Sequence, residues 1–86
     1  MKRAKKWPPT RVVEVSWFDA NARGSWGTVE EYMHHTSAPC LSVGYLLKQD
    51  NKEVILVQSV ATDHDTCTDA IAIPRGWIAK IRTLRK

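Results

Sequence analysis

The chain has 86 residues, of which 43% are apolar and 26% charged, and its formal net charge is +4. This composition is typical of a folded globular protein and excludes wholesale disorder. A chain of this length forms one small domain with little room for a deep enzyme cleft, so we expect copies of it to associate. No apolar run is long enough to span a bilayer.

Basic residues gather at the two ends of the chain. Ten of the thirteen lie within residues 2–11 and 75–86, whereas residues 12–74 hold all nine acidic residues. Phosphate-bearing partners are therefore plausible, and the alternative is that the basic ends only keep the protein in solution. Cys40 and Cys67 lie 27 positions apart and form no CxxC motif, and no apolar signal region follows the basic start. We expect reduced thiols and a cytoplasmic location.

The first half of the chain predicts a strand, a loop and a helix. Residues 1–10 are basic and end near a Trp-Pro-Pro run, which favours a flexible N-terminal arm, and the domain proper spans 11–86. Val13, Val15 and Trp17 alternate with polar residues, as in a half-buried strand.

A loop and a short helix are predicted next. Asp, Asn, Gly and Ser residues over 19–27 are typical of a loop. Thr28, followed by Glu31 three positions later, forms a capping-box signature, so we expect an inserted helix at 28–36.

The second half predicts strands joined by tight turns. Alternation indicates a strand at 41–47 with Gly44 at its centre, where a glycine permits bending. A hairpin turn at 49–52 leads to a strand over 54–60, and residues 62–69 form a polar, acidic break.

A short strand at 70–73, a turn at Pro74–Gly76 and a last strand at 78–84 complete the pattern. The fold class is therefore mainly β with one short helix (α+β), arranged as a five-stranded, strongly bent small barrel.

Two segments resemble the signatures of Sm-like barrels. Residues 43–47 with Asp50 and then 54–56 are similar to the bent strand, turn and apolar strand of the first signature, and residues 71–81 are similar to the second. The helix at 28–36 departs from the family, which usually places its helix before the first strand. The overall pattern also resembles small proteins of tailed phages and prophages. That resemblance implies a counter-defence role in the cytoplasm of a host cell.

Candidate ligand-binding residues lie at two turns. The Sm-like resemblance implies contact with nucleotides near a subunit junction through Asp50, Asn51, Arg75 and Gly76. From the residues themselves, a glycine lets backbone donors approach a ligand and an arginine can bind a phosphate through two hydrogen bonds. The alternative is an ordinary tight turn with an arginine facing solvent.

Two tryptophans extend this set. Trp26 and Trp77 lie close in sequence to Arg23 and Arg75, and an aromatic face beside a cation can stack on a base while the cation meets a phosphate. The alternative is that each tryptophan seals an end of the barrel. Trp17, within the first strand, is expected in the core.

Signatures of catalysis and of metal binding are weak. His34 and His35 near Cys40, and residues 63–65 near Cys67, contain ligand types suited to zinc, but their spacing fits neither a zinc site nor an activated nucleophile. We therefore expect that the protein is not an enzyme and that it binds neither a metal ion nor a cofactor.

The leading hypothesis is a non-enzymatic, homo-oligomeric protein that binds a phosphate-containing nucleotide ligand. In its specific form, the protein is a sponge, which sequesters a nucleotide immune signal. A single-stranded RNA or DNA binder is the first alternative. A protein-interaction module that inhibits a host factor is the second, and an enzyme that degrades a nucleotide signal is the third. None of these involves a membrane.

Overall fold

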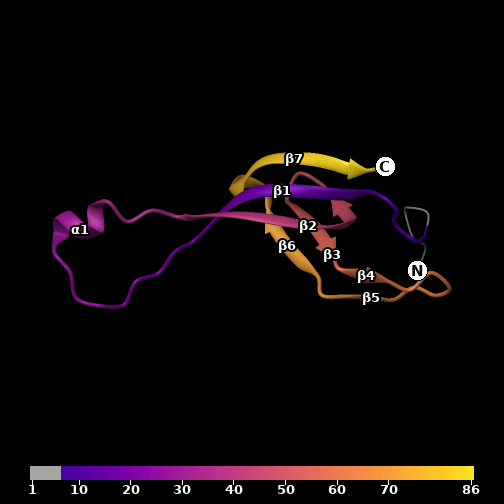
Figure 1. Cartoon of the computed structure of the whole chain (residues 1–86), viewed down its shortest axis with the longest axis horizontal. Coiled ribbons are helices and arrows are strands. Elements are labelled where there is room, and N and C mark those ends of the chain that lie inside the picture. Colours follow the sequence, from indigo (N-terminus) through magenta and orange to yellow (C-terminus); the bar gives the residue numbers. More distant parts are fainter. Residues whose placement is uncertain (1–6) are drawn as a thin grey trace.

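The computed structural model describes residues 7–86 and is mainly β with one short helix, as the sequence predicts. Of the arm predicted over residues 1–10, residues 1–6 lie outside the described residues. The strands are β1 (Val12–Asp19), β2 (Ala38–Gln49), β3 (Glu53–Val57), β4 (Ser59–Val60), β5 (Cys67–Thr68), β6 (Ile71–Pro74) and β7 (Ile78–Arg85). The helix α1 (Val29–Met33) lies between β1 and β2, and a 3-10 turn η1 (Arg75–Trp77) joins β6 to β7 (Figure 1).

Five strands form one antiparallel sheet in the order β6-β3-β2-β1-β7. β6 and β7 are its two edges and do not pair with each other, so the predicted barrel is not closed. β4 and β5 form a separate two-stranded hairpin. Within residues 7–86, no helix has the length and hydrophobicity needed to cross a membrane.

The core lies on one face of this sheet. Its buried residues come from four strands: Val13, Val15, Leu46, Val54, Leu56 and Ile73. Trp17, Ile78 and Ile81 pack against them, which confirms the predicted place of Trp17 and shows that both edge strands contribute to the same core. The sheet is therefore curved around its apolar side chains, because burial of both edges against one cluster requires bending.

Several predicted elements have different bounds, and β2 spans Ala38–Gln49 instead of 41–47. The helix spans Val29–Met33 instead of 28–36, although its predicted start is correct, because the Thr28 hydroxyl accepts a hydrogen bond of 3.1 Å from the Glu31 N–H. It buries no residue, and so short a helix without packing gains little beyond its cap.

The predicted strand over 54–60 is divided. β3 ends at Val57. The Gln58 N–H donates to the Thr68 carbonyl at 3.0 Å, so from this point the chain pairs with β5 instead of β2. The predicted acidic break thus contains β5 and closes a small hairpin. The Trp7 indole N–H donates to the Ala61 carbonyl at 2.9 Å, which joins the N-terminal segment to this hairpin.

A long excursion separates β1 from β2. Residues 20–37, called the projection below, extend away from the sheet and carry α1 at their far end (Figure 1). The molecule is consequently elongated, with extents of 55, 22 and 21 Å.

Candidate functional site

The two turns predicted as ligand sites meet within one chain. Because β3 and β6 pair in antiparallel register with Glu53 opposite Pro74, the turn before β3 lies beside the chain leaving β6. The Arg75 N–H donates a hydrogen bond of 3.0 Å to the Lys52 carbonyl. Asp50, Asn51, Arg75 and Gly76 are therefore brought to one end of the sheet without help from a second subunit. We call Asn51, Lys52, Arg75, Gly76 and Trp77 the corner.

Asp50 is occupied by its own turn. One carboxylate oxygen accepts hydrogen bonds of 2.9 Å from the N–H groups of Lys52 and Glu53, and the other lies 3.3 Å from the Lys48 ammonium. The Glu53 and Lys52 N–H groups and then Lys48 lower the pKa of Asp50 below its ordinary value, so the group stays ionised. Its contacts make Asp50 the residue that holds the turn in shape.

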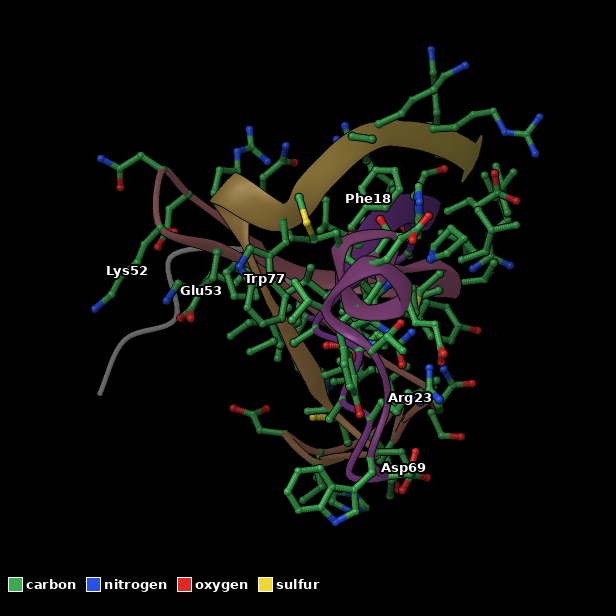
Figure 2. All side chains as sticks on the ribbon, turned by 90° about the vertical axis from the view of Figure 1, so that its left-hand side faces the viewer. Phe18, Arg23, Lys52, Glu53, Asp69 and Trp77 are labelled. Carbon is green, nitrogen blue, oxygen red and sulfur yellow. The ribbon has the colours of Figure 1, made fainter. Side chains whose placement is uncertain are left out.

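The corner carries two exposed cations, Lys52 and Arg75. Lys48 differs from them, because its ammonium lies 3.2 Å from Glu53 and close to Asp50. Among the described residues, no carboxylate forms an ion pair with Lys52 or Arg75, and Figure 2 shows Lys52 pointing into solvent. Lys52 is not among the site residues that the sequence predicts. The sequence feature that could have indicated Lys52 is its position in the hairpin turn at 49–52, which belongs to the Sm-like pattern.

An exposed aromatic side chain, Trp77, ends the same 3-10 turn that Arg75 begins. Trp77 stacks on Trp17 with 6.4 Å between ring centroids and 11° between ring planes, and it remains 43% exposed. Trp17 is held in turn by a hydrogen bond of 3.0 Å from its indole N–H to the Ser42 hydroxyl. A Cβ at Gly76 would meet nothing within 4 Å, so the backbone there is open to a ligand.

A shallow hollow lies at this aromatic side chain. It measures about 340 Å³ and is lined by Gly76, Trp77 and Phe18 together with Asp19, Ala20 and Ser37 at the base of the projection. An apolar wall next to exposed cations can hold a base by stacking and a phosphate by charge.

The other two predicted site residues lie elsewhere. Trp26 is fully exposed on the projection, so the alternative that it seals a barrel end is wrong. Arg23 donates to the Ser25 hydroxyl at 3.1 Å, pairs with Glu31 at 3.5 Å and lies 5.0 Å from the Tyr32 ring centroid. These contacts tie Arg23 to the fold of the projection, and the structure does not bring it or Trp26 to the corner.

Residue types suited to zinc do not converge. Within the described part of the chain, no three His, Cys, Asp or Glu side chains lie close enough to hold a metal ion. Cys40 and Cys67 are free, with Cys40 partly buried and Cys67 exposed.

Comparison with known proteins gives no assignment: no family model, curated protein or solved structure matches this chain.

Proposed function

We propose that this chain is a non-enzymatic, homo-oligomeric protein that binds a phosphate-containing nucleotide ligand at the corner. The observation that carries the proposal is the hydrogen bond from the Arg75 N–H to the Lys52 carbonyl, which brings together two residues whose cations have no acidic partner among residues 7–86, while the half-exposed Trp77 follows Arg75 two positions later. Phosphate recognition needs cations that are free of internal carboxylates, and base recognition needs an exposed aromatic face.

The proposal includes an Sm-like architecture of the open sheet. Its support is that β6 and β7, although unpaired, both pack side chains against one core, as the two ends of a nearly closed barrel would. The edges of β6 and β7 also offer backbone groups to which another chain could pair.

Within this function, the specific role we propose is sequestration of a nucleotide immune signal by a phage-encoded protein. Its support is the resemblance of the sequence and the size of the hollow, which suits a small ligand better than a long strand. A single-stranded nucleic acid binder is favoured instead by β7, which carries no acidic residue and three basic ones, Lys80, Arg82 and Arg85, although Arg82 pairs with Glu14 of β1 at 3.3 Å.

Calorimetric titration tests the proposal directly. The probes are cyclic dinucleotides, a cyclic ADP-ribose-type signal, and short single-stranded RNA and DNA at two salt concentrations. We expect one small nucleotide to bind with little salt dependence, whereas a steep loss of affinity with salt identifies the nucleic acid version. If none of these probes binds the purified chain, the proposed function is wrong.

Arg75→Ala is the variant that tests the corner, and Arg11→Ala is its control. Arg11 is an exposed arginine directly before the start of β1 and is not part of the corner. Loss of a hydrogen bond to a charged group should lower affinity about tenfold or more in Arg75→Ala. Mass spectrometry of the ligand after incubation separates binding from catalysis. An unchanged mass agrees with sequestration, and a changed mass contradicts it.

A further inference from the structure

The projection has a folded shape of its own but no packing against the sheet that would explain its apolar residues. The Asn21 side-chain amide donates to the Thr36 carbonyl at 3.2 Å, and the Tyr32 hydroxyl donates to the Ser25 carbonyl. The helix at its far end buries no residue. The chain therefore holds this segment in a defined form that projects into solvent (Figure 1).

Three apolar side chains on the projection are left in water. Trp26 is 100% exposed, Val29 78% and Met33 80%, and we call these three residues the apolar tip. Val29 and Met33 are four positions apart in α1 and so lie on the same helix face. Burial of a fully exposed tryptophan by a partner is favourable, because large aromatic side chains dominate interface energetics.

A second apolar surface lies on the sheet. Val13 and Val15 point into the core, so Ser16 and Phe18 point to the opposite face. There Phe18 pairs with Pro39, and Ser16 pairs with Leu41.

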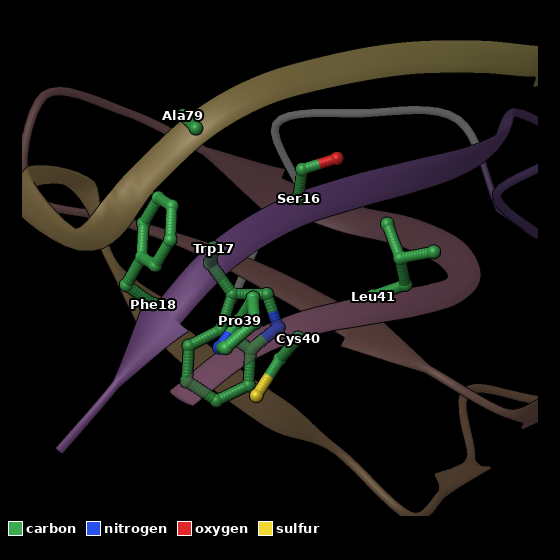
Figure 3. A pocket seen from close by; sticks show the side chains of 7 residues that line it. All are labelled: Ser16, Trp17, Phe18, Pro39, Cys40, Leu41 and Ala79. Atoms are coloured by element: carbon green, nitrogen blue, oxygen red, sulfur yellow. The ribbon is translucent and has the colours of Figure 1, made fainter. Parts of the chain in front are cut away.

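This outer face is open. Phe18, Pro39, Leu41 and Val43 form what we call the apolar strip, of which Phe18 is 49%, Leu41 68% and Val43 44% exposed. Part of the strip borders a hollow of about 490 Å³, shown in Figure 3 with Phe18 on its left and Leu41 on its right.

We propose that the apolar tip of one copy docks on the apolar strip of a second copy, and that the contact is reciprocal. The projection leads away from the sheet, so a tip cannot fold back onto the strip of its own chain without a change in the structure. Two elongated chains lying antiparallel about a two-fold axis place each tip at the base of the partner's projection. Both contacts then form together, as a closed isologous dimer requires.

The distribution of charged residues favours a second copy of this chain as the partner that covers the apolar strip. The projection carries one arginine and two glutamates, whereas β7, which runs beside β1, carries three basic residues and no acid, and of these Arg82 already pairs with Glu14 of β1. Lys80 is the β7 partner of Ser16, which lines the hollow, while Glu30 lies next to Val29 in the tip. Among the described residues, neither Glu30 nor Lys80 has an ion-pair partner. Docking would supply one to each.

The exposed apolar side chains of the tip and the strip would supply much of such an interface. An aromatic side chain contributes about 150–250 Å² when buried, and a stable dimer buries at least about 1,200 Å² in total. The two Trp26 side chains supply a large share, and the Phe18 and Leu41 side chains of both copies add to it. This inference deepens the homo-oligomer part of the proposed function and rests on that part alone, not on nucleotide binding.

A complementation experiment tests the reciprocal contact. Trp26→Ala removes the largest side chain of the apolar tip, and Leu41→Glu places a charge in the apolar strip. Both positions are exposed, so each variant should fold. By sedimentation velocity, the unchanged chain should form dimers, and each variant alone should show a dissociation constant raised about tenfold or more. An equal mixture should associate more tightly than either variant alone, because one intact tip then meets one intact strip.

Controls separate this result from other modes of association. Leu84→Ala changes an exposed apolar residue near the far end of β7 and should leave the dimer intact. Glu30→Lys and Lys80→Glu should each weaken association, and their combination should restore it. A chain that stays monomeric, an oligomer indifferent to both Trp26→Ala and Leu41→Glu, or a mixture that fails to associate would each overturn the proposal.

The same proteins distinguish this inference from the proposed function. Arg75→Ala should still dimerise, because its side chain lies outside the tip and the strip. A dimer that binds no nucleotide overturns nucleotide binding and leaves the docking of tip on strip intact. A monomer that binds nucleotide overturns the docking and the homo-oligomer part of the function, and leaves nucleotide binding intact.

Discussion

The Arg75 N–H donates a hydrogen bond of 3.0 Å to the Lys52 carbonyl, and this bond fixes the chain leaving β6 against the turn before β3. The bond uses backbone atoms only, so both side chains can be changed without removing it. The positions of Lys52 and Arg75 are consequently set by the sheet, while their cations remain available to a ligand.

A double-mutant cycle measures whether both cations serve one ligand. We expect Lys52→Ala and Arg75→Ala each to lower nucleotide affinity about tenfold, because each removes a charged contact to phosphate. The double variant should lose less than the product of the two single effects if both cations contact the same phosphate group. Calorimetry supplies the affinities, and independent effects would indicate separate contacts.

Trp77 should contribute to binding through its exposed face. Trp77→Ala removes a stacking surface that is worth about 1–3 kcal/mol per base, so affinity should fall about tenfold or more. It also removes the stack on Trp17, which should lower the free energy of unfolding by about 0.5–1.5 kcal/mol or more.

Trp77→Phe is the matched control for this prediction, since it keeps an aromatic face. It should retain most of the affinity in titration and most of the stability in urea unfolding. Equal affinity in Trp77→Ala and the unchanged chain would exclude Trp77 from the site.

Gly44 should not tolerate a side chain. A Cβ there would lie 2.9 Å from the Val57 carbonyl oxygen and 3.2 Å from the Leu56 Cβ, and the first of these is backbone that cannot move aside easily. Gly44→Ala should therefore reduce the free energy of unfolding by about 1–3 kcal/mol in denaturant titration. Gly24→Ala is the control, because a Cβ at Gly24 meets nothing within 4 Å. Equal stability of the two variants would contradict the close approach of β2 and β3.

Asp50 should make the stability of the protein depend on pH. Its pKa is lowered from the ordinary 3.8, chiefly by the Glu53 and Lys52 N–H groups, so the folded state favours the ionised form. This contribution is fully present above the ordinary pKa and is lost as pH falls through the lowered folded value. In Asp50→Asn, thermal unfolding should show a smaller loss of stability below about pH 4. An unchanged acid dependence would show that other carboxylates account for it.

Local patterns in the sequence determined most of the secondary structure. Alternation of Val13 and Val15 with polar residues identified β1, and the Thr28 capping box identified the start of α1. Both signals arise from neighbours in the chain, so they can be read without knowing the fold. The bounds of β3 and β4 could not be read in this way, because Gln58 changes partner to Thr68, ten positions further on.

The candidate site divides in the same manner. The sequence identified Arg75, Gly76 and Trp77 as a basic turn with an aromatic neighbour, since these residues are adjacent. Only the tertiary structure placed Lys52 beside Arg75, because the pairing of β3 with β6 joins segments more than twenty positions apart. It also separated Trp26 and Arg23 from the corner. A loop of eighteen residues can fold back or project, and which occurs depends on packing that local sequence does not encode.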